Sequence, residues 1–480
     1  MNPLSSAYDP EHFRAQGHRL IDDLANRLTA SLAGQGNVGS TVTPNEEFEH
    51  WAARMNQPSE EVGDFLAEFA ARSIQLHHPH YMGHQVCAPA PAAALAGLAA
   101  ELLNNGMAVY EMGPAATALE RWIIQRTAAV LDLPEGDGFL TSGGTLATLT
   151  ALLGARSRQL GDSVLEQGTE PKWAVITSEE SHYCVSRAVQ VMGWGKESVI
   201  LVSTDEAFKM RTDLLDECYQ QAVLRGRTPI AVVGSACTTS TGSYDDLTAI
   251  GNFCAERKLW FHVDGAHGGA VAYCPELRSK LTGVAFADSV ILDFHKLLLT
   301  PALATAVIFR DRSASWAAFH QRAQYLWDEA AGEEWFNVGR RSFECTKLSM
   351  SVKIAAIFRT GGETLLAENV RTVHQLARTF AACIKARSAF ELAVDPESNI
   401  VCFRHLPENS DSESLDAHNA FIRRSIIQSG KFYIVQTILR GKTWLRCALM
   451  NPLTTSDHLN ALLDEIEQIA ATMKRGEGMS

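Results

Sequence analysis

The chain has 480 residues, of which 46% are hydrophobic, and 42 Lys and Arg against 55 Asp and Glu give a formal net charge of −13. This length supports two or three packed regions, and an acidic chain without a basic run argues against a nucleic-acid partner. The first residues lack a basic and apolar leader, and every apolar stretch is broken well before the roughly 18 residues that span a bilayer. Ten scattered cysteines form no CxxC pair, so we expect a cytoplasmic protein without a membrane partner.

The N-terminal part is predicted to be helical. Apolar residues recur at helical spacing over residues 10–34, where Gly34 ends the run, and a similar pattern covers residues 60–76. We expect residues 1–76 to form a helical segment that packs on a second copy of the chain as readily as on its own.

Apolar strands alternate with helices after about residue 117. A helix at 117–133 is followed by strands within 136–141, 173–178, 198–204, 229–236, 259–264 and 288–294. Continuous apolar strands of this kind are typical of a mostly parallel sheet covered by helices on both faces. We expect residues 77–345 to form a large α/β domain and residues 346–480 a smaller α+β domain, which begins with a long helical stretch at 346–376.

Polar and glycine-rich stretches follow four of these strands, at the sheet edge where α/β proteins bind ligands. The first, TSGGT at 141–145, has two glycines that let an anion approach the start of the next helix. The second is His182 in ESHY, and the third is the hydroxyl-rich stretch 236–242 with Thr239. Taken alone, each of these three is explained equally well or better as a turn or a helix cap.

The fourth stretch ends in a carboxylate, and a lysine follows the next strand. Asp264 ends the strand 259–264, and Lys296 lies in DSVILDFHKLLLTP, where Asp293 is expected to orient the turn. Burial among leucines is expected to lower the pKa of Lys296 and leave a nucleophilic amine. An aldehyde cofactor that carries a phosphate would use the glycine loop, the histidine, the carboxylate and the lysine together. Pyridoxal 5′-phosphate is that cofactor.

In this order and spacing, TSGGT, ESHY, HVDGAHGG and DFHK resemble the pyridoxal-phosphate-dependent group II amino-acid decarboxylases. That family includes glutamate, cysteine sulfinate, aromatic-amino-acid, histidine and diaminobutyrate enzymes. The resemblance covers nearly the whole chain and extends to PHYMGHQ, YEMGPAATALE, GRRSFE and WLRCALMNP. It implies the α/β architecture of fold type I, like aspartate aminotransferase, with a mostly parallel seven-stranded sheet. It also implies an obligate homodimer with the active site at the subunit interface.

The resemblance implies a role for each matching residue in a decarboxylation that passes through an external aldimine and a quinonoid. Lys296 would form the internal aldimine, and Asp264 would pair with the ring nitrogen. Ala266 and His182 would pack on the two ring faces. The remaining matches are Gly144, Thr145, Thr239 and His295 at the phosphate or ring substituents, Gly339 near the phosphate across the dimer interface, Tyr325 at protonation, and Arg446 at the substrate carboxylate.

The substrate is expected to be small and polar or acidic. His84 and Gln85 stand where relatives with acidic substrates carry Asn-Gln, which suggests aspartate, glutamate, cysteine sulfinate or 2,4-diaminobutyrate. An alternative stays open, in which these two side chains only form hydrogen bonds within their own loop. Two departures from the family pattern bear on the substrate: Ala108 replaces a large aromatic ring, and Pro301–Ala304 is apolar.

Other functions are compatible with parts of this pattern. An aromatic-amino-acid decarboxylase or a decarboxylating aldehyde synthase shares the motifs, but the chain keeps His182 and Tyr325, so plain amine release is expected. A non-catalytic relative is disfavoured because the whole catalytic set is present. A metal hydrolase would use the histidines, but HExxH is absent. The candidate metal ligands of that alternative are His77, His78, His80, His84, His262, Asp264 and His267.

Overall fold

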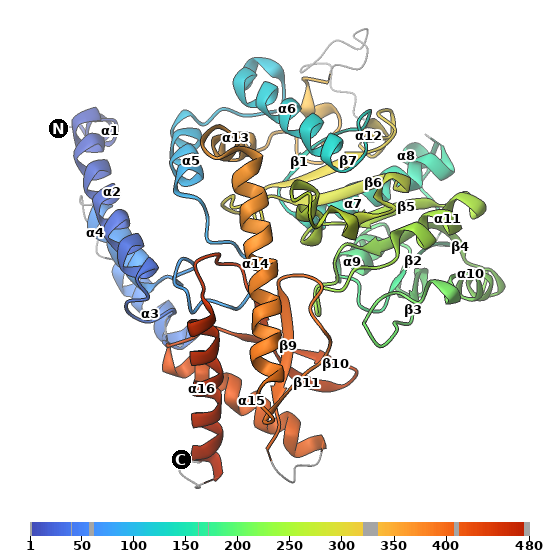
Figure 1. Ribbon diagram of the computed structural model, residues 1–480. Coiled ribbons are helices and arrows are strands. Elements are labelled where there is room, and N and C mark those ends of the chain that lie inside the picture. Colours follow the sequence, from blue (N-terminus) through green and yellow to red (C-terminus); the bar gives the residue numbers. More distant parts are fainter. Residues whose placement is uncertain are drawn as a thin grey trace. The chain divides into compact units, whose positions relative to one another are not determined.

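The chain forms two compact units, which are seen in a computed structural model that describes residues 2–39, 41–56, 62–161, 163–170, 172–319, 335–407 and 412–474 (Figure 1). The large unit comprises Gln85–Arg378 and Val394–Val401. The small unit comprises Met1–His84, Thr379–Ala393 and Cys402–Ser480. The three-part division expected from the sequence, with boundaries at 76 and 345, stays a prediction.

A seven-stranded sheet forms the centre of the large unit. In spatial order the strands are β1 (Asp137–Thr141), β7 (Thr305–Phe309), β6 (Ser289–Asp293), β5 (Trp260–Asp264), β4 (Thr228–Ser235), β2 (Trp173–Ser178) and β3 (Val199–Val202). Of these described strands, only β7 runs antiparallel to its neighbours, β1 and β6. The expectation of a mostly parallel seven-stranded sheet in an α/β fold is therefore confirmed.

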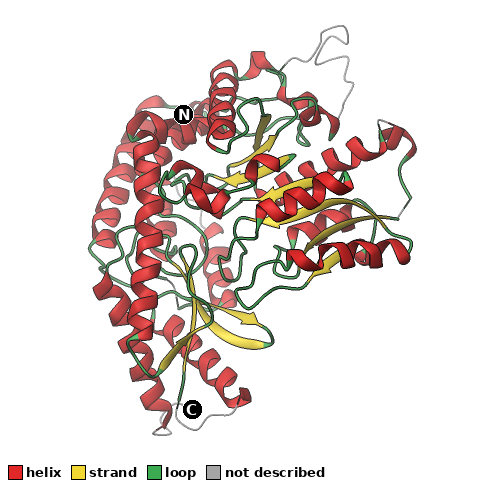
Figure 2. Cartoon of the chain, turned by 45° about the vertical axis from the view of Figure 1, so that its right-hand side comes forward, coloured by secondary structure: helices red, strands yellow, loops and turns green. Residues whose placement is uncertain are grey.

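Helices cover this sheet, and Figure 2 shows its strands between them. The helices of the large unit are α5 (Pro91–Leu103), α6 (Pro114–Val130), α7 (Gly144–Leu160), α8 (Ser163–Gln167), α9 (Cys184–Val191), α10 (Leu215–Leu224), α11 (Leu247–Arg257), α12 (Ala314–Ala317), α13 (Met350–Thr360) and most of α14 (Gly362–Lys385). Helices α7 and α9 contact each other and share a hydrophobic core with the strands. The strands β1, β5, β6 and β7 are buried along their whole length, which explains their continuous apolar sequence.

The small unit combines N-terminal helices with a four-stranded sheet. Its helices are α1 (Pro3–Ala7), α2 (Pro10–Leu32), α3 (Pro44–Met55), α4 (Val62–Arg72), α15 (Ser412–Ser429) and α16 (Ser456–Lys474). Its strands follow the spatial order β10 (Val435–Leu439), β11 (Lys442–Ala448), β9 (Ile400–His405) and β8 (Phe390–Leu392). The predicted helices at 10–34 and 60–76 correspond to α2 and α4.

Two features of the fold differ from the sequence expectations. Strand β7 was not anticipated, although it lies beside the strand that carries the predicted lysine. The long helical stretch expected at 346–376 is two helices, α13 and α14, because Gly361 ends the first and Gly362 has a positive φ of 61°.

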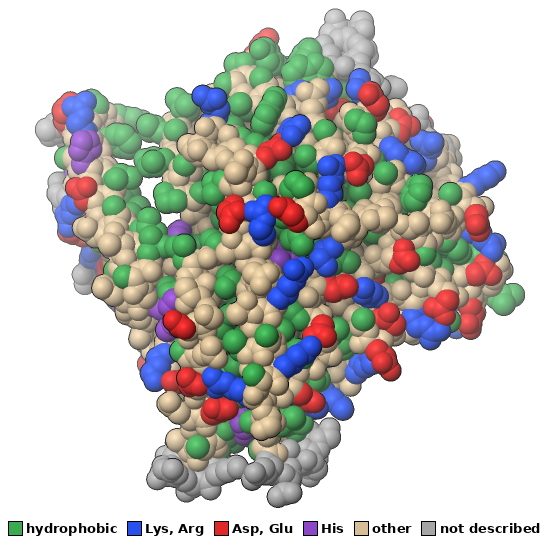
Figure 3. Space-filling model, in the orientation of Figure 1, with side chains coloured by type: hydrophobic (Ala, Val, Ile, Leu, Met, Phe, Trp, Pro, Cys, Tyr) green, Lys and Arg blue, Asp and Glu red, His purple; other side chains and the backbone are tan. Residues whose placement is uncertain are grey.

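The surface and the cysteines complete the description of the fold. Cationic and anionic side chains are interspersed over the face drawn in Figure 3. All ten cysteines are free thiols, and seven of them are buried. Within the described ranges, no helix has the length and apolar character that crossing a membrane requires.

Candidate active site

A cavity of about 270 Å³ lies in the large unit, where strands β5 and β6 end and helix α7 begins. Parallel strands present their carboxyl ends at one edge, so side chains far apart in sequence meet there. The cavity brings together these predicted site residues: Gly144, Thr145, His182, Thr239, Asp264, Ala266, His295 and Lys296. Leu303, from the apolar stretch Pro301–Ala304 that the sequence analysis related to the substrate, also lines the cavity. Sequence reasoning did not assign Ser142, Cys184 or Cys237 to the site, and it gave Asp293 no place in it.

The start of helix α7 forms one wall of the cavity. Gly143 has a φ of 122°, which favours glycine, and no side chain caps the helix. A Cβ atom at Gly144 would lie 3.4 Å from both carboxylate oxygens of Asp293 and 3.7 Å from the Ala266 Cβ, so glycine leaves the backbone open at this point. Free N–H groups and the helix dipole favour an anion at this position.

Asp264 supplies a buried carboxylate at the end of β5. Its strand pairs with β4 through Ser235 and with β6 through Ile291, which fixes the position of the side chain. Its Oδ1 accepts a hydrogen bond of 3.1 Å from the Ala266 amide. Burial raises the pKa of Asp264, while the charge of Lys296 and this hydrogen bond oppose the rise.

Lys296 forms an ion pair that the sequence did not reveal. Its Nζ lies 3.0 Å from Asp293 Oδ2, and the Asp293 side chain is only 2% exposed. Burial by itself would lower the pKa of Lys296, but the charges of Asp293 and Asp264 outweigh burial and raise it. The expected lowering of this pKa was therefore wrong, because it considered burial without the neighbouring carboxylates.

His182 is held as a neutral ring. Its Nδ1 accepts a hydrogen bond of 3.2 Å from the Cys184 amide, so Nε2 carries the proton. Burial lowers the pKa of His182. The negative charge of Asp264 raises this pKa, whereas the positive charge of Lys296 lowers it further. A neutral imidazole offers a flat face for stacking without adding a second cation beside Lys296.

The remaining histidines near the cavity have structural partners. His295 Nδ1 accepts a 3.1 Å hydrogen bond from the Ala304 amide, and its Nε2 lies 3.5 Å from Asp293 Oδ2. His267 Nε2 lies 2.6 Å from Asn399 Oδ1. These contacts fix the two loops that frame Lys296 and Asp264.

Some predicted residues do not line this cavity. Gly339 donates its amide hydrogen to the Ala108 carbonyl at 3.0 Å, and Gln85 belongs to the large unit outside the lining. Tyr325 lies outside the described residues. His84 and Arg446 belong to the small unit.

Within the small unit, His84 lies in a cationic neighbourhood. Its amide donates to the Tyr81 hydroxyl at 3.2 Å, and its ring is 5.9 Å from that of Tyr433. Burial lowers the pKa of His84, and the charges of Arg446 and Arg423 lower it further. Arg423 also has a buried Nε that lacks a hydrogen-bond partner among the described residues. Sequence reasoning missed Arg423, which lies on α15 far from any motif.

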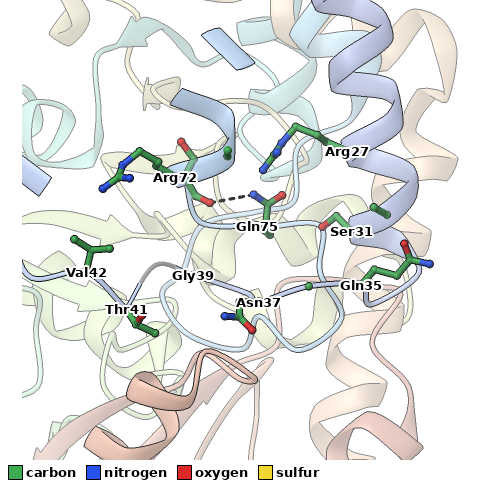
Figure 4. A pocket seen from close by; sticks show the side chains of 13 residues that line it. Arg27, Ser31, Gln35, Asn37, Gly39, Thr41, Val42, Arg72 and Gln75 are labelled. Carbon is green, nitrogen blue, oxygen red and sulfur yellow. Dashed lines mark hydrogen bonds between the residues drawn. The ribbon is translucent and has the colours of Figure 1, made fainter. Parts of the chain in front are cut away.

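A second cavity, of about 460 Å³, lies in the small unit between α2, α4 and the segment around residues 35–42 (Figure 4). Arg27 and Arg72 lie on either side of Gln75 in this view. Arg27 donates to the Ala70 carbonyl at 2.7 Å, and Arg72 pairs with Glu47. Both cations are engaged in local structure, so we assign no chemistry to this cavity.

Comparison with known proteins identifies relatives over most of the chain. The family model described as pyridoxal-dependent decarboxylase conserved domain matches residues 47–406. The acidic amino acid decarboxylase of Xenopus tropicalis is 28% identical and the L-2,4-diaminobutyrate decarboxylase of Rhizobium meliloti is 29% identical. These matches cover 86% and 87% of this chain, and 83% and 84% of the relatives.

A solved structure shares both the fold and the sequence pattern. It is the glutamate decarboxylase domain of the diaminobutyrate-pyruvate transaminase and L-2,4-diaminobutyrate decarboxylase from Vibrio parahaemolyticus. The TM-score is 0.84 at 26% identity, and the match covers 96% of each chain. The family resemblance stated from the motifs is confirmed, and the metal-hydrolase alternative is set aside.

Proposed function

The chain belongs to the pyridoxal-dependent decarboxylases, and from this premise we propose that it acts on a small acidic L-amino acid and holds its cofactor in the cavity between β5, β6 and α7. As a member of this family the protein is a carboxy-lyase that uses pyridoxal 5′-phosphate to release carbon dioxide from an amino acid. The substrate, the residue roles and the assembly are the parts we propose.

The cavity residues fit a phosphate-bearing aldehyde cofactor. The uncapped start of α7, open at Gly144, suits the phosphate, and Thr145, Thr239 and His295 lie around the same cavity. Bound pyridoxal phosphate supplies an electron sink for the electrons that carbon dioxide leaves behind. The buried carboxylate of Asp264 would keep the ring nitrogen protonated. Ala266 and the neutral ring of His182 would pack against the two faces.

The observation that carries the proposal is the position of Lys296. Its amine lines the same cavity as the glycine start of α7 and the carboxylates of Asp264 and Asp293. An amine that lines a cavity beside an anion site is the arrangement that captures a phosphorylated aldehyde. The carboxylates of Asp264 and Asp293 are buried, so charges there interact more strongly than in bulk solvent.

The acidic substrate is supported by the small unit and by the relatives. The charges of Arg446 and Arg423 both act on His84, so two guanidinium groups lie in the neighbourhood of this imidazole. Arg446 would receive a substrate carboxylate, and His84 with Gln85 would contact the substrate side chain. A cationic neighbourhood favours the substrate class in the Xenopus relative's name over the diaminobutyrate in the Rhizobium relative's name.

A screen for carbon dioxide release tests this proposal. The purified enzyme is offered aspartate, glutamate, cysteine sulfinate, 2,4-diaminobutyrate, phenylalanine and DOPA, and amine, aldehyde, ammonia and peroxide are quantified with the carbon dioxide. We expect the acidic substrates to have the highest kcat/KM and to give amine without ammonia. A preference for diaminobutyrate or for an aromatic substrate would contradict the proposal, and stoichiometric ammonia with peroxide would establish the aldehyde synthase alternative.

Arginine variants test whether Arg423 contributes to the preference for acidic substrates. We expect Arg423→Gln to lower kcat/KM for acidic substrates by roughly 10- to 100-fold, since a charge-assisted contact contributes about 1.5–3 kcal/mol. Arg440→Gln, which changes an exposed arginine in the turn between β10 and β11, provides the control. Equal losses in both variants would remove the support from Arg423.

The assembly we propose is a homodimer in the cytoplasm. Helix α2 and the turn before it expose large side chains, among them Phe13 at 51% and Tyr8 at 83%, which a second copy would cover. A Cβ at Gly339 would lie 2.9 Å from the Ala108 carbonyl oxygen, and this close pair would face the neighbour's phosphate. The ten free thiols favour a reducing compartment. The N-terminal segment 1–76, the large domain 77–345 and the small domain 346–480 would be its parts.

A further inference from the structure

Asp293 lies where three elements of the large unit converge. It is the last residue of β6, it pairs in register with Thr305 at the start of β7, and its oxygens approach the start of α7 at Gly144. The Thr305 hydroxyl donates to Oδ1 at 2.5 Å, while Oδ2 lies 3.0 Å from Lys296 Nζ. Both oxygens are therefore engaged, and the side chain has one fixed orientation.

The charges around Asp293 come from every element packed against it. Lys296 and His295 follow it on the same loop, with His295 Nε2 at 3.5 Å. Asp264 on β5 interacts electrostatically with Lys296 and Asp293, and so does His182 in the loop before α9. Lys296 thus faces two carboxylates, and one of them also lies against the anion site of α7.

We propose that Asp293 is a positioning residue that restrains capture of the cofactor by Lys296, because its carboxylate holds the amine as an ammonium ion and puts a negative charge beside the phosphate site. The proposal rests on the role given to Lys296 above. It goes beyond that role, since it assigns to Asp293 the control of when the amine reacts.

Two physical effects act in the same direction. An ammonium group has no lone pair, so it attacks an aldehyde only after it loses a proton to solvent. In capture, the nitrogen then forms a double bond to the aldehyde carbon, and the aldehyde oxygen leaves as water with two protons from the nitrogen. A carboxylate near Gly144 also repels an arriving phosphate, which the α7 start attracts. Neutralising Asp293 weakens both restraints.

The test follows capture of pyridoxal phosphate by the cofactor-stripped full-length protein, using visible absorbance at pH values from 5.5 to 9.5. We expect Asp293→Asn to capture the cofactor about tenfold faster at pH 7 and to shift the midpoint of the pH profile by about one unit to lower pH. Asp293→Glu keeps the charge and should keep the wild-type midpoint. Asp288→Asn is the matched control, because Asp288 precedes β6 but bonds Arg310 and Phe261 away from the cavity.

Each outcome decides the proposal. An Asp293→Asn profile with the wild-type midpoint, or slower capture at every pH, overturns it, even if thermal stability changes. Should that variant fail to fold, Thr305→Val decides: loss of the hydroxyl strengthens the Asp293 pairing with Lys296, so the midpoint must move to higher pH, and a wild-type or lower midpoint overturns the proposal. Lys296→Ala distinguishes a failure of this proposal from a failure of the role given to Lys296. If it still captures the cofactor with the wild-type spectrum, the role of Lys296 itself is wrong.

Discussion

At the scale of single residues, the cavity places two carboxylates beside one ammonium group. Asp264 and Asp293 are both buried, and each would be costly to ionise alone in such a place. Lys296 gives both a counter-charge, and Thr305 and the Ala266 amide satisfy further oxygens. The charges are therefore stable as a group, and removing any one of them changes the state of the others.

Removal of the lysine gives the first prediction. We expect Lys296→Ala to lose the visible band that borohydride bleaches and to lower kcat by on the order of 10³-fold or more, because the covalent attachment point is gone. Peptide mapping after borohydride reduction checks the attachment site. Lys353→Ala is the control, since Lys353 bonds the Pro301 and Ala302 carbonyls outside the cavity lining. A label on another lysine would contradict the assignment.

Which residues form the site was easier to predict from the sequence than their protonation states. Asp264 and Lys296 were found because a charged side chain at the end of an apolar strand needs a partner or a use. The predicted direction of the Lys296 pKa shift was wrong. The shift depends on the orientation of the Asp293 side chain toward the amine, and the sequence does not fix that orientation. The signal that was available is the spacing, with a carboxylate three residues before the lysine.

At the scale of elements, a buried ion pair joins three segments of the large unit. Lys347 Nζ lies 2.6 Å from Glu120 Oε1 on α6 and 2.6 Å from the Leu140 carbonyl on β1. Both side chains are almost fully buried, at 2% and 4% exposed. Burial lowers the pKa of Lys347, and Glu120 opposes the change. The pair therefore fixes α6 and the segment before α13 to the strand that leads into the glycine turn.

Breaking this pair gives the second prediction. Glu120→Gln leaves a buried ammonium without its counter-charge, so we expect the free energy of unfolding to fall by about 3–5 kcal/mol. Urea denaturation of the purified enzyme measures the loss. The double variant Glu120→Gln with Lys347→Met should recover much of it, because the unpaired charge is removed as well. A single variant as stable as the wild type would show that the pair contributes little.

Elements with a strong apolar pattern were predicted, and those defined by pairing were not. Strand β6 could be recognised from its continuous apolar run, whereas β7 is five residues that follow the turn around Pro301. Its antiparallel direction is set by the return of the chain from Asp293 to Thr305, which is a matter of tertiary pairing. The cationic neighbourhood of His84 was missed for the same reason, since α15 and β11 supply its arginines.

At the scale of the whole molecule, the exposed apolar side chains of α2 bear on assembly. Ile21 and Leu24 are 41% and 44% exposed, although they continue the apolar stripe of an amphipathic helix. We expect Leu24→Glu to shift the sedimentation coefficient from that of a dimer to that of a monomer at micromolar concentration, because a charge would be buried in the interface. Asn26→Glu adds the same charge at a polar position of α2 and should stay dimeric. A monomeric wild type would exclude the proposed assembly.

Acid stability is a second property of the whole chain. Burial lowers the pKa of His262 and of His374 to about 4, while an unfolded histidine titrates near 6.5. Between these values the unfolded chain binds more protons, so stability is complete above pH 6.5 and falls as the pH drops toward 4, by about 3 kcal/mol for each histidine. Urea midpoints between pH 7 and 4.5 should decline less steeply in His374→Leu. His12→Leu, on the exposed surface of α2, is the control, and parallel declines in all three proteins would contradict the role of His374.

The position of β1 at the end of the sheet sets an order of events during biosynthesis. Among the strands of the described residues its one neighbour is β7, and Thr141 precedes its partner Thr305 by 164 residues. At about 5–20 residues per second, a ribosome needs roughly 10–30 seconds to make that stretch. The glycine turn and the first strand of the sheet are therefore exposed on the nascent chain until Phe309 has left the exit tunnel. Truncated chains that end before that residue lack β7, so the seven-stranded sheet beside the cavity is completed only after that strand has been made.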